Sequence, residues 1–167
     1  MTGALDFTKV FLEEFEERSQ EELTKLKNNF HDLKTVLPEQ ITACAGIAYI
    51  KASQPFYQGY HLAESLCKYA KNFAKEHVKQ NDPVPSCLAF HRITTSIIDK
   101  YETALEREFR RELKNNGIQL TMQPYKVGKV EPTVKSDELV QLDGLKELLN
   151  LLPKVSHGTF REFLSLL

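Results

Sequence analysis

The stretch Ile41-Thr-Ala-Cys-Ala-Gly-Ile-Ala-Tyr-Ile-Lys51 has ten uncharged residues before its final lysine. Apolar or small side chains occupy both alternating sets of positions, so both faces of a strand formed here would be apolar. A strand of this kind is normally a central one that is covered by a layer on each side. We therefore expect a buried strand over 41–51.

An amphipathic helix is predicted directly after this strand, from about Phe56 to His77. The turn Ser53-Gln-Pro55 precedes it, and apolar residues return at helical spacing along one face. Its polar side carries four lysines, which are Lys68, Lys71, Lys75 and Lys79. After a turn at 81–85, a second, mostly apolar strand is predicted over 86–93.

Helices are predicted for most of the remaining chain. Residues 5–36 are expected to be helical, with a break near Ser19, where Ser19 and Glu22 could form a capping box. A helix over 94–113 ends at Gly117, and a short strand over 118–122 and a linker over 126–136 follow. Two leucine-rich helices over 137–152 and about 160–167 close the chain.

Composition places the chain among globular proteins and excludes some functions. Of its 167 residues, 41% are hydrophobic and 27% are charged, and the net charge of −1 argues against a uniformly basic nucleic-acid clamp. Neither a membrane-spanning run nor a signal peptide is recognisable, so we expect a cytoplasmic protein without a membrane partner. The three scattered cysteines are expected to be reduced core thiols.

Several short motifs resemble a known family. The strand Thr42-Ala-Cys-Ala-Gly-Ile-Ala48, a helix that ends in Ala70-Lys71, and the strand Cys87-Leu-Ala-Phe90 resemble the second half of the polymerase-like palm in the large subunit of type III CRISPR effector complexes. That palm is similar to the GGDEF domains of diguanylate cyclases. The segment from Ala4 to Phe15 also resembles the helix after the family's Gly-Gly-Asp-Asp hairpin, so the resemblance covers residues 4–93.

The metal-binding part of that family has no counterpart in this sequence. In the family, the hairpin and the first palm strand carry carboxylates that hold two metal ions for catalysis. This chain has no Gly-Gly dipeptide and no Asp-Asp pair. The resemblance therefore implies half a palm, as a fragment, a split-gene product or a stand-alone relative. We assign no catalytic or metal-binding residue, and ATP with Mg²⁺ would bind only if the missing half were supplied.

The expected fold is α/β (α+β), a ferredoxin-like or palm-type half domain. Its helices would pack on a small antiparallel sheet, with a helical C-terminal tail. We place a palm-like domain at 1–114, and a strand, linker and leucine-rich helical extension packed on it at 115–167. A small sheet with exposed edges favours pairing with another chain. The expected partner is another palm half, an effector subunit or a second copy.

Two readings stand for each candidate site residue. The resemblance implies that Lys71 faces nucleotide phosphates, but a solvated helix lysine is the simpler interpretation. Small residues at Ala43, Ala45 and Gly46 leave room for a nucleobase or ribose, or for tight helix packing. The other three lysines of the helix, which are Lys68, Lys75 and Lys79, could contact an RNA backbone or simply form its wet face.

Weaker candidates are two histidines and a carboxylate pair. His61 and His91 are possible acid–base groups, but neither has a neighbouring partner in the sequence, and ordinary half-buried histidines are the simpler reading. Asp99 and Glu102 lie one helical turn apart and could hold a metal, although surface carboxylates without a second pair are weak evidence.

The leading functional hypothesis is a palm-like nucleotide-binding domain, related to the nucleotidyltransferase that makes cyclic oligoadenylates in type III CRISPR antiviral defence. Without the metal ligands, we expect it not to be catalytic alone. The competing hypothesis is a non-catalytic interaction module that pairs with a partner subunit or itself and has possible RNA contact.

Overall fold

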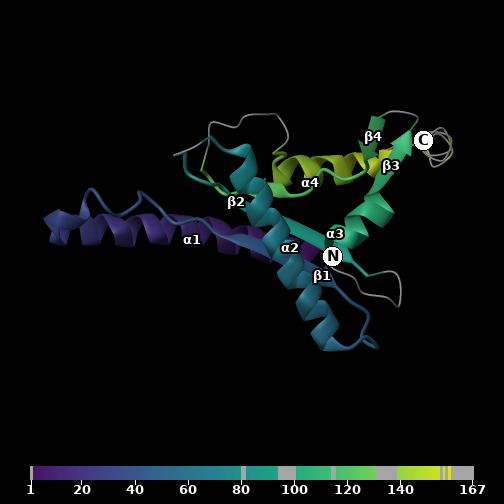
Figure 1. The fold of residues 1–167 in the computed structure, drawn as a ribbon, viewed down its shortest axis with the longest axis horizontal. Coiled ribbons are helices and arrows are strands. Elements are labelled where there is room, and N and C mark those ends of the chain that lie inside the picture. The colour runs from purple at the N-terminus through teal and green to yellow at the C-terminus, as the bar shows by residue number, and fades with distance from the viewer. Residues whose placement is uncertain are drawn as a thin grey trace.

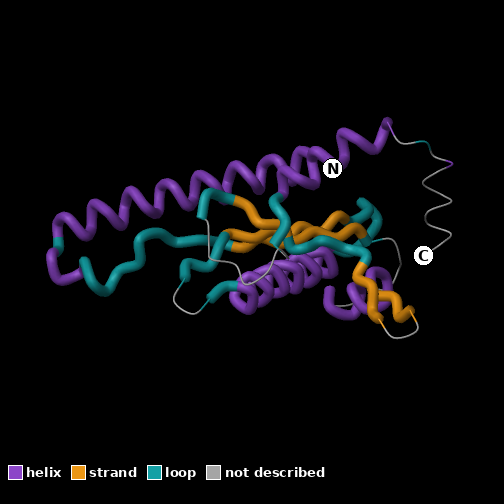
Figure 2. The backbone as a smooth tube through the Cα atoms, turned by 90° about the horizontal axis from the view of Figure 1, so that it is seen from above, coloured by secondary structure: helices purple, strands orange, loops and turns teal. Residues whose placement is uncertain are grey.

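A three-stranded sheet lies between two layers of helices in the computed structural model of the chain (Figure 1, Figure 2). The structure describes residues 2–79, 82–93, 101–113, 116–130 and 139–154, together with Ser156 and Gly158. The strands are β1 (Cys44–Tyr49), β2 (Ser86–Arg92), β3 (Arg110–Leu113), β4 (Asn116–Gln119) and β5 (Tyr125–Val127). The helices are α1 (Thr2–Asn29), α2 (Phe56–His77), α3 (Tyr101–Ala104) and α4 (Leu142–Leu151).

The sheet is mixed rather than antiparallel, which corrects the expected topology within the confirmed α+β class. Its strand order is β1-β2-β5. Strands β1 and β2 are parallel, with Cys44 opposite Cys87 and Tyr49 opposite Arg92, whereas β5 pairs antiparallel with β2. The pairing of β1 and β2 is parallel because helix α2 returns the chain to the starting end of the sheet. The central strand is therefore β2, and β1 lies at an edge.

Helix α2 covers one face of the sheet. Its buried residues include Leu62, Leu66 and Ala70, and they pack with Cys87 and Ala89 of β2. The predicted range of this helix, 56–77, is confirmed. The N-terminal proline at Pro55 suits the start of the helix, and the spacing of its apolar residues explains which face is buried.

Helices α1 and α4 cover the opposite face. Leu5 and Leu12 of α1, Leu142 of α4 and Leu88 of β2 form a second core cluster with two residues of β5. Two ion pairs join these helices, between Lys9 and Asp143 at 2.7 Å and between Lys146 and Asp6 at 2.6 Å. Figure 2 shows the two helices on the same side of the sheet.

Helix α1 is continuous through Ser19, so the predicted break is wrong, and the helix ends at Asn29 rather than near residue 36. The Ser19 hydroxyl does not cap a new helix. It lies 2.8 Å from the Glu16 carbonyl oxygen and accepts the Ile41 N–H at 3.1 Å, which ties the returning chain to the helix. A short 3₁₀ helix, His31–Leu33, follows, and the end of α1 forms an arm that projects beyond the sheet (Figure 1).

The prediction was least accurate after residue 93. Residues 94–100 and the tail helix at about 160–167 lie outside the described residues. The helix predicted to reach 113 ends as a π-helical turn, Leu105–Phe109, and strands β3 and β4 then form a separate hairpin. Two residues of the linker predicted over 126–136 belong to strand β5 of the main sheet. Helix α4 forms only the later part of the helix predicted over 137–152, and the 3₁₀ turn Leu152–Lys154 follows it.

Gly46 allows α2 to lie directly on β1. A Cβ atom at this position would overlap the Ala63 carbonyl oxygen, and it would lie 2.6 Å from the Cys67 nitrogen and 2.8 Å from the Leu66 Cβ. Two of these neighbours are helix backbone, which cannot rotate away. The small side chains predicted for this strand therefore serve close helix packing at Gly46.

Substitution of this glycine tests the contact. We expect Gly46→Ala to lower the free energy of unfolding by about 3 kcal/mol, because the added methyl group forces α2 and β1 apart. Gly144→Ala is the matched control, since its new Cβ would meet only a Val140 methyl group at 3.9 Å. Urea unfolding of both variants measures the difference, and a near-wild-type midpoint for Gly46→Ala would contradict the close contact.

Candidate functional site

The four predicted nucleotide-binding residues do not lie on one surface. Ala43 and Ala45 pack against the core beneath α1 and α4, whereas Gly46 faces α2 on the other side of the sheet. Lys71 is exposed on α2. The space in front of Gly46 is filled by helix backbone, so these residues form no common pocket for a base or ribose.

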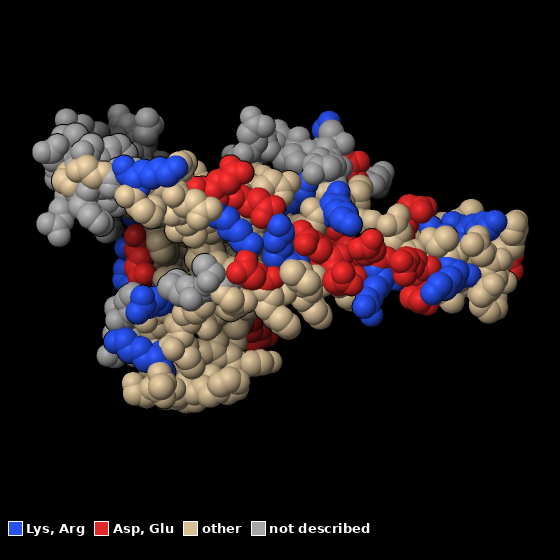
Figure 3. Space-filling view, turned by 180° about the vertical axis from the view of Figure 1, so that it is seen from behind, with Lys and Arg blue, Asp and Glu red and all other residues tan. Residues whose placement is uncertain are grey.

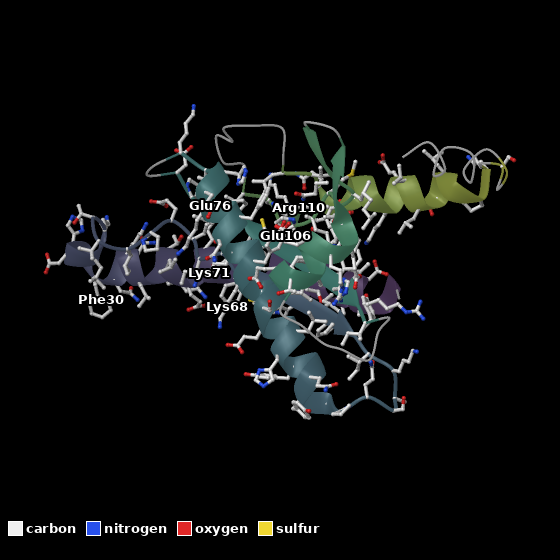
Figure 4. All side chains as sticks on the ribbon, turned by 45° about the vertical axis from the view of Figure 1, so that its right-hand side comes forward. Phe30, Lys68, Lys71, Glu76, Glu106 and Arg110 are labelled. Atoms are coloured by element: carbon white, nitrogen blue, oxygen red, sulfur yellow. The ribbon has the colours of Figure 1, made fainter. Side chains whose placement is uncertain are left out.

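Three lysines of α2 form an exposed row. Lys68, Lys71 and Lys75 are exposed, and Lys68 and Lys71 leave the helix on the same side (Figure 4). Lys79 is also exposed but lies beyond the end of α2 at His77, so it does not continue the helical row. Lys68 pairs with Glu64 at 3.1 Å. Lys71 and Lys75 form no salt bridge with a carboxylate in the described part of the chain. These two cations are therefore available to a phosphate, and an RNA contact here remains a prediction.

The three cysteines converge in the fold, although they are far apart in the sequence. Cys44 lies opposite Cys87 in the sheet, and the Cys67 thiol of α2 donates a hydrogen bond to the Cys44 carbonyl oxygen at 3.2 Å. All three are free thiols. Burial raises the pKa of Cys44 and of Cys87, so both are protonated at neutral pH and are poor nucleophiles or metal ligands.

A buried polar cluster at the carboxyl end of β2 was missed by sequence reasoning. The Nε2 atom of His91 lies 3.6 Å from a carboxylate oxygen of Glu108, and its ring is in contact distance of Tyr101 and Phe109, with centroids 5.8 Å away in both cases. Burial lowers the pKa of His91, and the Glu108 charge opposes this shift. The neutral imidazole is thus a core group with a carboxylate neighbour.

The carboxylate Glu102 belongs to the same region but has a structural role. The Ser65 hydroxyl donates to Glu102 at 3.0 Å and accepts the Tyr101 N–H at 2.8 Å, which joins the start of α3 to α2. Asp99, its predicted metal-binding partner, lies outside the described residues. Among the residues that are described, no group of three or more His, Cys, Asp or Glu side chains has an arrangement suited to a metal ion.

Gln123 connects three elements around this cluster. Its side-chain oxygen accepts the Phe90 N–H at 2.6 Å, beyond the point where β5 stops pairing with β2. Its carbonyl oxygen accepts a hydrogen bond from the Tyr69 hydroxyl of α2 at 3.1 Å. These hydrogen bonds satisfy buried backbone and side-chain polar groups, which would cost free energy if they were left without a partner. They therefore hold the segment before β5 against β2 and α2.

The outer edge of β1 is the most distinctive open feature of the sheet. The Tyr49 carbonyl oxygen accepts the Ile93 N–H at 3.0 Å, and the Ala43 N–H donates to the Ser86 hydroxyl at 3.1 Å. Because backbone groups alternate along a strand, those of Gly46 and Ala48 point away from β2. Within the described residues, β1 pairs with β2 alone. This edge offers donors and acceptors to another strand.

The protonation of His91 gives a pH test of the buried cluster. Its pKa is lowered in the folded state, so the unfolded chain takes up this proton first as the pH falls below about 6.5. We expect stability to fall between pH 7 and pH 5, and His91→Gln to reduce this slope. Urea unfolding at several pH values checks this, with the exposed His61→Gln as control, and equal slopes in all three proteins would contradict it.

Comparisons with protein-family models and with curated protein sequences find no match to this chain. Among the described helices, none combines the length and the apolarity needed to cross a bilayer. Three exposed surfaces are therefore the candidate binding sites. They are the outer edge of β1, the lysine row of α2, and the outer face of α1, which carries Phe7, Phe11 and Phe15.

Proposed function

We propose that this chain is an interaction module whose sheet is completed by a strand from a partner. The observation that carries this proposal is the open edge of β1, where the backbone groups of Gly46 and Ala48 face away from β2. Pairing along an exposed edge is a common mode of recognition, in which main-chain hydrogen bonds supply affinity.

The two helical layers support this proposal. Helix α2 packs on one face of β1 and helix α1 on the other, so a further strand beside β1 would enter between layers that already exist. All six residues of β1 are only half-buried, which leaves apolar surface for such a neighbour to cover. A three-stranded sheet is also small for an independent domain.

The partner that fits best is another half of a palm-type domain, an effector subunit of the same assembly or a second copy of the chain. If the chain is half of a palm domain, the first palm strand, which this sequence lacks, would lie next to β1. The absence of a Gly-Gly-Asp-Asp motif from this sequence agrees with a module that is not catalytic by itself.

Hydrogen exchange and one substitution test the open edge. In the isolated chain we expect the amides of Gly46 and Ala48 to exchange much faster than those of Ala45 and Ile47, which face β2. A partner that supplies the first palm strand should then slow the exchange of both. Slow exchange of Gly46 and Ala48 in the monomeric chain would contradict an open edge.

Ala48→Pro should block the partner, because it removes an outward N–H donor and proline is tolerated at sheet edges. We expect at least tenfold weaker binding of the partner, measured by calorimetry, and a folded chain by circular dichroism. Ala48→Ser is the control, because it retains the N–H group. Equal binding by the proline and serine variants would reject strand pairing at this edge.

A second candidate function is binding of ATP by the palm half, and it is favoured by the charges of Lys71 and Lys75, which form no ion pair with a carboxylate of the described residues. Burial raises the pKa of Cys44, whereas the positive charges of both lysines lower it, so both charges act on the first residue of β1. A lysine ammonium group in such a place is suited to phosphate as a point charge.

Calorimetry with ATP, with and without Mg²⁺, tests this second function. We expect Lys71→Ala to weaken binding about tenfold, since one charge-assisted hydrogen bond contributes about 1.5–3 kcal/mol. Lys25→Ala, an exposed lysine paired with Glu22 on α1, should leave binding unchanged. If the wild type and both variants give no heat of binding with ATP, nucleotide binding by this half is rejected. That result would not affect the strand-pairing proposal.

A further inference from the structure

We propose that the outer face of α1 is a docking surface for a basic amphipathic helix of a partner protein. This inference concerns a surface distinct from the edge of β1, and it does not require strand pairing there. It starts from an apolar surface on α1 that the sheet does not cover.

Aromatic side chains form a continuous stripe on that face. Phe7 is 72% exposed, Phe11 is 55% exposed and Phe15 is 36% exposed, and neighbouring rings lie 6.4 Å apart in each pair. Val10, between them, is 57% exposed. A different face of the helix buries Leu5 and Leu12 in the core, so the stripe is not needed to hold α1 on the sheet.

The area of the stripe is large enough to matter. With ~200 Å² for a phenylalanine side chain, these four residues expose roughly 400 Å². Contiguous apolar patches of about 300–600 Å² on soluble proteins are often functional. Exposed apolar residues continue along the arm with Leu26 and Phe30, and Phe30 lies at its far end (Figure 4).

The shape of the stripe favours a helix as its occupant. Phe7, Phe11 and Phe15 follow one another at intervals of four residues, which forms a single ridge along α1. Ridges of this spacing pack into the groove of a second helix, the commonest mode of helix packing. Amphipathic helices recognise such surfaces through apolar residues at the same spacing.

The charge beside the stripe favours a basic partner. Glu13, Glu17 and Glu21 follow at intervals of four residues along the side of the stripe where Val10 lies. Glu13 and Glu17 already form ion pairs with Lys9 at 3.7 Å and with Lys129 at 3.6 Å, and such surface pairs contribute little free energy. The preference for a basic partner therefore rests on the excess of carboxylates along α1. Helix α1 contains seven carboxylates and four basic residues, and Figure 3 shows carboxylates gathered along it. A second copy would bring two such acidic rows together, which is repulsive, whereas lysine and arginine on a partner would pair with them.

A pair of designed peptides tests the inference on the whole chain. One probe is an 18-residue amphipathic helix of leucine and lysine, and the other has glutamate at every lysine position. We expect only the lysine peptide to bind in calorimetry, with affinity that falls as salt is added. Phe11→Ser should weaken this binding at least tenfold, as for a central anchor residue.

Phe56→Ser is the matched control, because Phe56 is an aromatic residue at the start of α2 that is even more exposed than Phe11. It should bind the lysine peptide as the wild type does. The inference would be overturned if Phe11→Ser and Phe56→Ser lost affinity for the lysine peptide equally. It would also be overturned if the lysine and glutamate peptides bound equally well, or if neither peptide bound. A dimer in sedimentation that Phe11→Ser dissociates would also overturn it, since it would assign this face to a second copy.

Discussion

The missing side chain at Gly46 is the constraint on which the arrangement of the sheet and α2 depends. The backbone of α2 at Ala63 and Cys67 occupies the space that a Cβ atom would need, so the helix lies against β1 without an intervening side-chain layer. This close approach lets Leu62 and Leu66 reach the neighbouring strand, where they pack with Cys87 and Ala89. The parallel pairing of β1 and β2 then follows from a crossover helix that is held tightly on one face. It also excludes a ligand from the same space, because helix backbone already fills it.

The local part of the fold could be predicted from the sequence, and the long-range part could not. Residues 41–51 and 86–93 are short, mostly apolar runs, and residues 56–77 have helical periodicity, so each pattern extends over enough residues to identify its element. Strand β5 has only three residues and is stabilised by its pairing with β2, which no local pattern indicates. The hairpin of β3 and β4 replaces the end of a predicted helix, because its strands pair with each other rather than continue the helical pattern.

The residue types proposed for a nucleotide site could be chosen from the sequence, but the positions of these residues relative to one another in space could not. A two-residue period already separates Ala43 and Ala45 from Gly46, and the structure places them in contact with different helical layers. The partner of His91 could not be found in the sequence, because Glu108 is 17 residues away and a π-helical turn sets its direction. Conversely, Phe7, Phe11 and Phe15 have the spacing of a buried helix face but are exposed, because Leu5 and Leu12 supply the face that packs on the sheet.

The layered architecture separates the open surfaces by both direction and chemistry. A strand beside β1 would lie in the plane of the sheet, whereas a helix on α1 would lie outside it, so one occupant does not block the other. The outer face of α1 is rich in carboxylates and aromatic rings, while the exposed side of α2 carries lysines. The proposed ligands would therefore differ in the layer they prefer, with an anion drawn to α2 and a basic helix drawn to α1. Because the sheet holds these layers apart, the proposed occupants of the three surfaces would be distinguished by charge as well as by direction.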